Sequence, residues 1–166
     1  MSSPPKPPSD AIAPGLGLVV IVWGQLEYTV SLSLAVMLNI HQHPQNDAVL
    51  GFIDFREKLE IIKAWGFVHR PNDRWHRRLE KVVNHIDNDL RPRRNRMIHH
   101  NWLPGTAGAH TLQDPKPKLK RPQSFKRVLE NESIQISPSD MLQLVQDIWE
   151  AISALLKVMR EFPRSA

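Results

Sequence analysis

The chain has 166 residues, of which 41% are hydrophobic and 23% are charged, an ordinary composition for one globular domain with its own core. Lys and Arg number 22 against 17 Asp and Glu, and the resulting net charge of +5 allows an anionic partner without requiring one. The absence of cysteine excludes disulfides, thiolate metal sites and cysteine nucleophiles.

Residues 1–13 are rich in proline, starting with the string MSSPPKPPSD. They contain no apolar signal core, so we expect a flexible lead-in to a protein that works in the cytoplasm. A single domain is expected to follow over residues 14–163.

Residues 15–40 form a long apolar segment whose hydrophobic residues recur in steps of three and four. This period predicts a helix, with Pro14 well placed in its first turn. The segment is also long enough to cross a membrane, but Gln25 and Glu27 would then lie near the bilayer centre, where a carboxylate is costly. We therefore expect a buried helix and no membrane partner.

The second helix is expected after the break HQHPQND, with Asp47 as its cap. Its apolar stripe would run from Phe52 to Ile62, and it would end near Gly66.

The third helix is expected to begin at a cap provided by Asn72 or Asp73 and to run through Leu90. Pro92 removes a backbone hydrogen bond and clashes with the preceding turn, so the sequence predicts a kink or break near Leu90.

Residues 103–136 show little helical periodicity and many prolines, glycines and lysines. We expect an excursion, with a β-hairpin as one form of it. Its basic run includes Lys118, Lys120 and Arg121, which could contact nucleic acid or could form a solvated arm.

The last helix has the clearest start, with a cap at Ser137, a first-turn Pro138 and an acid at Asp140. Apolar residues then recur at helical spacing up to Phe162. The sequence as a whole predicts an all-α fold, an up-and-down four-helix bundle with the basic excursion between the third and fourth main helices.

The most unusual stretch is RPRRNRMIHHNW, residues 91–102, where arginine and histidine are concentrated next to an apolar seam. Within it, Arg94 and Asn95 are followed by three residues and then His99. This spacing, and the string RNRMIHHNW, resembles the signature of the HEPN superfamily. The resemblance implies an all-α bundle that is often dimeric, and many HEPN domains are metal-independent ribonucleases in toxin–antitoxin and antiviral systems.

These residue types suit RNA cleavage. RNA carries its own nucleophile in the 2′-hydroxyl, so the protein needs to supply only proton transfer and positive charge near the phosphate. An imidazole such as that of His99 can take or give a proton near neutral pH. The guanidinium of Arg94 can hold two phosphate oxygens, and the amide of Asn95 could orient the phosphate or the imidazole. We therefore expect RNA as a partner and no metal or cofactor.

Further candidates surround this motif: His100 and Arg96 as secondary site residues, and Arg91 and Arg93 as phosphate contacts. Glu27 should be partly buried on the first helix. A buried carboxylate requires a cation, so a structural pair with Arg94 or a neighbouring arginine is favoured over a direct role for Glu27 in chemistry.

Helical geometry separates the two main candidates, because Arg94 and His99 lie about 140° apart on an ideal helix. A distortion near Pro92 could bring them together. Alternatively, two chains could share one cleft, as the HEPN resemblance implies, which predicts a homodimer.

Other readings of the chain stay open. The motif could belong to a non-catalytic dimer that binds RNA, a nucleotide or a protein, or to a structural bundle with a basic rim. An antitoxin protein is a further candidate partner. His41 and His43 lack additional ligands at metal-binding spacing, and the five tryptophans are expected in the core.

Overall fold

Helices make up most of the described chain in the computed structural model, which confirms the all-α class. The structure describes residues 12–40, 48–71, 73–99, 101–104, 110–113, 118–120, 128–130 and 133–162.

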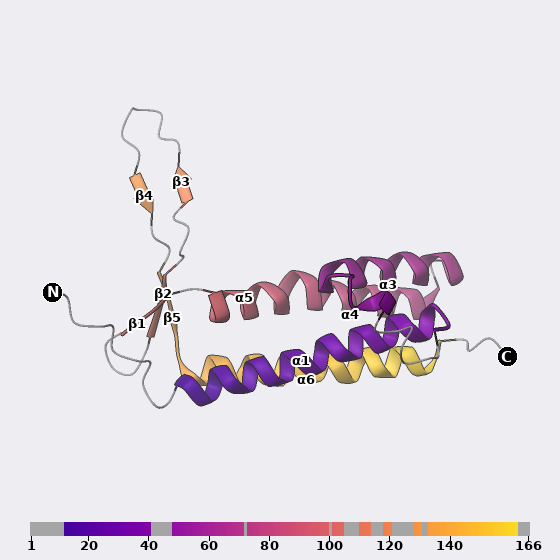
Figure 1. The fold of residues 1–166 in the computed structure, drawn as a ribbon, viewed down its shortest axis with the longest axis horizontal. Coiled ribbons are helices and arrows are strands. Elements are labelled where there is room, and N and C mark those ends of the chain that lie inside the picture. The colour runs from indigo at the N-terminus through magenta and orange to yellow at the C-terminus, as the bar shows by residue number, and fades with distance from the viewer. Residues whose placement is uncertain are drawn as a thin grey trace.

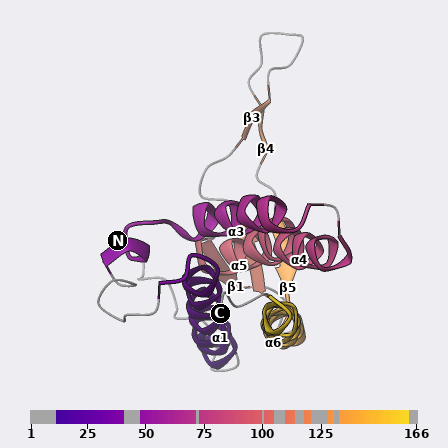
Figure 2. The same ribbon diagram turned by 90° about the vertical axis from the view of Figure 1, so that its right-hand side faces the viewer.

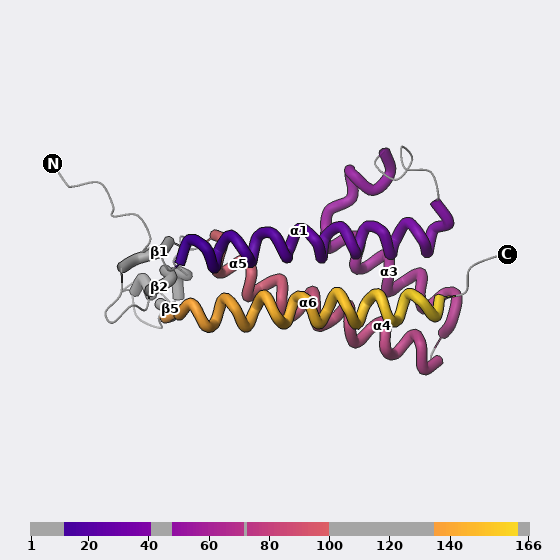
Figure 3. The backbone as a smooth tube through the Cα atoms, turned by 90° about the horizontal axis from the view of Figure 1, so that it is seen from below, coloured from indigo at the N-terminus to yellow at the C-terminus, as the bar shows by residue number. Residues whose placement is uncertain are grey.

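Two long helices, α1 (Ile12–Met37) and α6 (Pro138–Arg160), lie side by side and run in the same direction (Figures 1 and 3). The start of α6 is the expected capping box, in which Ser137 accepts from the backbone N–H of Asp140 and Asp140 accepts from that of Ser137. Near the two helix starts, a Cβ added at Gly15 would lie 2.7 Å from the sulfur of Met141. The small residue therefore lets α1 approach α6 closely.

Helix α3 (Phe55–His69) begins later than the sequence suggested, because Asp54 and Glu57 form a capping box at its start. The expected stripe position Phe52 lies before this cap and is 92% exposed, so that prediction is wrong. Asp47 lies outside the described residues. The helix also passes through Gly66 to His69, because Gly66 packs against the next helix instead of ending this one.

The third predicted helix is continuous from α4 (Arg74–His85) through a π-helical turn, η1 (Ile86–Leu90), into α5 (Arg91–His99). Asp73, one of the two predicted caps, accepts from the backbone N–H of His76, and the other candidate, Asn72, lies outside the described residues. The sequence predicted a kink or break near Leu90, and the structure has a π-helical turn at this place. Pro92 has no N–H to donate, and the helix widens before it without breaking.

The helices form two layers, with α1 and α6 in one and α3 with α4–η1–α5 in the other (Figures 1 and 2). The ring of Phe55 lies 5.1 Å from that of Trp23, and Lys58 Nζ donates to Ser31 Oγ at 3.0 Å, so α3 advances in the same general direction as α1. Strict up-and-down alternation is therefore absent, because α1 and α3 advance in the same general direction.

Short strands lie between α5 and α6 in the chain (Figure 1). Three of them form an antiparallel sheet in the order β1-β2-β5, and two more pair with each other as β3-β4. Their bounds are Asn101–Pro104 for β1, His110–Gln113 for β2, Lys118–Lys120 for β3, Val128–Glu130 for β4 and Ser133–Ile136 for β5. Arg121 lies outside the described residues.

The core combines side chains from both layers, and its fully buried members include Leu26, Leu34, Leu59, Leu79, Leu90 and Ile148. Trp23 and Trp75 are buried, as predicted, but Trp149 is 45% exposed because it lies on the outer flank of α6. Helix α1 is long and apolar enough to cross a membrane, and half of its most apolar 18-residue stretch is buried inside the protein.

Substitution of Gly66 by alanine should lower stability, because the new Cβ would lie 2.7 Å from Leu79 Cδ2. Overpacking costs about 1–3 kcal/mol and the gain in helix propensity returns up to about 1 kcal/mol, so we expect a net loss of about 1 kcal/mol in urea unfolding. Leu79→Val should cost less in the Gly66→Ala background than in the wild type, since it relieves the clash. Additive effects of the two substitutions would contradict this contact.

Candidate functional site

Arg94, Asn95 and His99 come together near the carboxyl end of α5. Arg94 Nη1 donates to Asn95 Oδ1 at 3.1 Å and lies 3.5 Å from His99 Nε2. Arg94 and Asn95 are partly buried and His99 is exposed, so the imidazole is accessible to solvent. One chain thus places a cation, an amide and an imidazole at a single point on its surface.

The expectation that helical geometry keeps Arg94 and His99 apart is wrong. Their backbones are five residues apart, about 7.5 Å along the helix axis. The long arginine side chain crosses this distance and turns towards the imidazole, which the angular projection of Cα positions does not capture. Neither a break at Pro92 nor a second chain is needed to bring these two groups together.

The guanidinium of Arg94 packs on α1, where its Cζ lies 5.5 Å from the ring centroid of Trp23. A cation over an indole face is favourable, more so when both groups are shielded from water, and Trp23 is only 3% exposed. The Nε of Arg94 is buried and has no hydrogen-bond partner within the described part of the chain. Trp23 therefore positions the cation from one side.

Glu27 does not occupy the predicted place. It is exposed, and its Oε1 accepts a hydrogen bond from Trp23 Nε1 at 2.7 Å. The indole ring bonds the carboxylate with its edge and contacts Arg94 with its face. Glu27 and Arg94 thus contact the same indole, and this arrangement replaces the predicted direct pair of the two residues.

Arg91 and Arg93 are both held by carboxylates. Arg91 Nε donates to Asp87 Oδ1 at 2.7 Å, and Arg93 Nη1 donates to Asp147 Oδ2 at 2.6 Å. These pairs join η1, α5 and α6, which favours a structural role for both arginines. Their charge is locally balanced, whereas Arg94 has no carboxylate partner among the residues that the structure describes.

The other predicted residues are dispersed. Arg96 is exposed and lines a different hollow, of about 230 Å³, between α5 and the start of α6. His100 lies outside the described residues. Lys118 and Lys120 form the two ends of β3, away from α5 in sequence.

Two carboxyl groups of α6 are stabilised in their charged form. For Asp147, burial raises the pKa, but hydrogen bonds from Gln143 and Arg93 together with the arginine charge outweigh it and leave the pKa below its ordinary value. For Asp140, hydrogen bonds from the side chain and backbone of Ser137 lower the pKa. Asp147 thereby links α6 to Arg93 of α5, and Asp140 caps the start of α6.

Chemically, the arrangement offers a proton acceptor and a fixed positive charge. When Arg94 donates to Nε2 of His99, that nitrogen is unprotonated and the ring proton sits on Nδ1. Among the described residues, there is no group of three or more His, Cys, Asp or Glu that could hold a metal ion.

Comparisons of the chain with family models, with curated proteins and with solved structures found no match.

Substitution of Asp147 by asparagine should lower stability at pH 7 by about 1 kcal/mol, because it removes a partly exposed ion pair with Arg93. The folded state lowers the pKa of this carboxyl, so the pair stabilises above the ordinary carboxyl pKa near 4 and is lost as pH falls through the folded value. The difference between wild type and variant in urea unfolding should therefore shrink below about pH 4.

The matched control is Asp89→Asn, because the carboxylate of Asp89 also faces Arg93, at 3.4 Å, but is half exposed. It should cost less than about 0.5 kcal/mol. A loss in Asp147→Asn that stays constant from pH 7 to pH 2.5 would show that the ion pair is not its cause.

Proposed function

We propose that this protein is a metal-independent endoribonuclease of the HEPN type, with Arg94 and His99 as its catalytic residues and Asn95 in support. The observation that carries the proposal is the 3.5 Å approach of Arg94 Nη1 to His99 Nε2 within one chain. This is the pair of residues that the motif resemblance singles out.

Cleavage would proceed by attack of the ribose 2′-oxygen on the adjacent phosphorus. His99 accepts the 2′-hydroxyl proton as the new P–O bond forms, and the bond to the 5′-oxygen breaks. The proton then reaches the 5′-oxygen, directly from the imidazole or through water. The products are a 2′,3′-cyclic phosphate and a 5′-hydroxyl, and Arg94 stabilises the charge that develops on the phosphate oxygens.

The contacts of the Arg94 side chain support its role in binding phosphate. It has no carboxylate partner within the described part of the chain, whereas Arg91 pairs with Asp87 and Arg93 pairs with both Asp147 and Asp89. Its contact with His99 is at the limit of a hydrogen bond, so a phosphate oxygen can displace it at little cost. The indole of Trp23 keeps the guanidinium in place while this exchange occurs.

The proposal also includes the arrangement of the helices and the setting in which the protein acts. We infer that four helical segments, with a basic strand-forming excursion before the last of them, form a HEPN-like domain. We further infer a cytoplasmic protein that acts as a toxin or phage-defence effector, with an antitoxin as its natural partner.

A non-catalytic module that binds RNA, a nucleotide or a protein is the second candidate. It is favoured by the presence of one imidazole at the site among the described residues, since proton transfer at both oxygens commonly uses two groups. Such a module would hold phosphate through Arg94 without cutting the chain.

The test is incubation of the purified protein with total RNA in EDTA, beside three variants. His99→Ala should lower the cleavage rate by about 10²-fold or more, and Arg94→Ala by about 10²–10³-fold, because each removes a group that acts in the transition state. Arg74→Ala, at an exposed position on α4, is the control and should cleave at the wild-type rate. End-group analysis should find 2′,3′-cyclic phosphates.

Cleavage that disappears with EDTA, or that survives in Arg94→Ala, would contradict the proposal. If no cleavage occurs, gel shifts against RNA at several salt concentrations distinguish the second candidate. A binding module loses affinity as salt rises and keeps most of it in His99→Ala.

A further inference from the structure

Helices α4 and α6 enclose a hollow of about 400 Å³ between them, here called the trough. The two helices run antiparallel, because Trp75 Nε1 near the start of α4 donates to Val158 O near the end of α6 at 2.8 Å. Further along the same continuous helix, Arg93 reaches back to Asp147. The volume of the trough is within the range of small-molecule sites, which is about 300–1,000 Å³.

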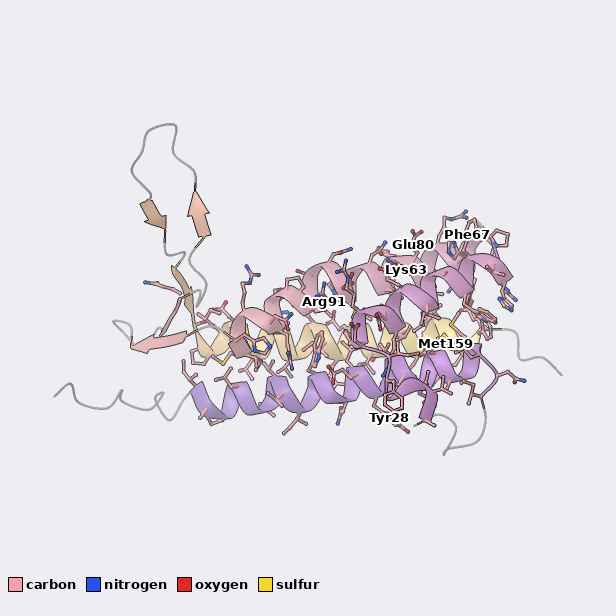
Figure 4. All side chains as sticks on the ribbon, turned by 45° about the horizontal axis from the view of Figure 1, so that its top comes forward. Tyr28, Lys63, Phe67, Glu80, Arg91 and Met159 are labelled. Atoms are coloured by element: carbon pink, nitrogen blue, oxygen red, sulfur yellow. The ribbon has the colours of Figure 1, made fainter. Side chains whose placement is uncertain are left out.

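The trough is separate from the candidate site. In Figure 4, Arg91 lies nearer to the strands than do Glu80 on α4 and Met159 on α6. Lys81, which lines the trough, precedes Arg94 by thirteen residues, roughly 20 Å along a continuous helix. A ligand in the trough therefore does not contact the Arg94 side chain.

The floor of the trough is aliphatic. It is formed by Val82 of α4 and by Ala151, Ala154 and Val158 of α6, all buried or half-buried. The small alanines leave the space that larger side chains would fill. Apart from the imidazole of His85 at one end, no aromatic ring lines the trough among the described residues, and none of them offers an amide or a hydroxyl. The floor thus suits an aliphatic chain better than a nucleobase, which is usually stacked and hydrogen-bonded at its edge.

One end of the trough is cationic. Arg78 and Lys81 of α4 lie on one wall there, and Lys157 of α6 lies on the other. Arg78 is occupied by Glu161, to which its Nη1 donates at 2.9 Å. Lys81 and Lys157 are exposed and form no ion pair within the described part of the chain. Two such cations on opposite walls favour an anion between them.

The other end of the trough carries little net charge. Glu150 lies there and accepts from Gln146 at 3.2 Å, and His85 Nδ1 lies 3.4 Å from Asp89. From Arg78 to His85 the trough is about 10.5 Å long, seven residues of helix. A partner with negative charge along its whole length, such as a nucleic-acid strand or an acidic helix, would face Glu150 with its second half. A ligand with one anionic head and an apolar tail matches both ends.

We propose that the trough binds a free aliphatic carboxylate of medium chain length. Its head lies between Lys81 and Lys157, and its chain follows Ala154 and Ala151 towards Glu150. An extended chain advances about 1.2 Å per covalent bond, so roughly nine bonds fill the trough. The proposal goes beyond the nuclease proposal and does not depend on it.

The first test is calorimetric titration of the purified protein with hexanoate, octanoate, decanoate and dodecanoate below their micelle-forming concentrations. Decanoate should bind with a Kd of about 10 µM to 1 mM. Half-burial of each CH₂ tightens binding about twofold, so decanoate should bind roughly 15-fold more tightly than hexanoate, and the two further carbons of dodecanoate should add less than about twofold. Decanol and decyltrimethylammonium lack the negative charge and should bind at least about fivefold more weakly. Equal binding of the cationic probe, or a decanoate Kd above about 1 mM, would overturn the proposal.

The second test locates the ligand. Ala154→Leu fills the trough and should weaken decanoate binding by about tenfold or more, because the chain loses its contact with the floor. The matched control is Ser153→Leu, at an exposed neighbour that does not line the trough, and it should bind as the wild type does. Lys81→Gln and Lys157→Gln should each weaken binding about threefold, and Arg74→Gln should not. Circular dichroism checks that each variant is folded. Undiminished binding by a folded Ala154→Leu would contradict the assignment.

The same titrations distinguish other occupants of the trough. Arg94→Ala should bind decanoate as the wild type does, so a failure of the nuclease proposal leaves this result unchanged. Two outcomes would overturn the proposal by assigning the trough to a different partner. One is tighter binding of a helical peptide whose leucine face is flanked by glutamates. The other is flotation of the wild type, but not of Lys81→Gln, with phosphatidylglycerol vesicles.

Discussion

The packing of α1 against α6 is the contact on which the other elements depend. The two helices run parallel, and Gly15 allows a close approach at their starts. The inner side of this pair provides the apolar floor for α3 and α4–η1–α5, so the second layer cannot bury its own stripe without it. On the side that faces away from α3 and α4, the same two helices expose apolar residues to solvent.

The candidate site depends on how α5 is oriented above this floor. The π turn of η1 inserts an additional residue into the helix and rotates α5 by roughly 100° relative to an unbroken continuation of α4. In the resulting orientation Arg94 lies on Trp23, while Arg91 and Arg93 reach carboxylates on η1 and α6. Of the four arginines in this stretch, two are thereby structural cations, Arg94 has no carboxylate partner in the described part of the chain, and Arg96 is exposed beside a different hollow.

Local features were predictable wherever a short string of residues decides the outcome. The cap at Ser137, and the cap at Asp73 as one of two candidates, could be predicted because each involves only the next three residues. The widened turn before Pro92 follows from the missing N–H. The start of α3 was missed although Asp54 and Glu57 form a capping box of the same kind, since the apolar spacing from Phe52 suggested an earlier turn.

The sequence by itself determined the helical class, the capped starts of α4 and α6 and the residues Arg94, Asn95 and His99 as candidates for one site. Only the tertiary structure decided the direction of α3, the exposure of Trp149, the separation of Glu27 from Arg94 and the approach of Arg94 to His99. The reason is physical: period and capping act over a few residues, whereas side-chain partners depend on which helices become neighbours and on the reach of long side chains.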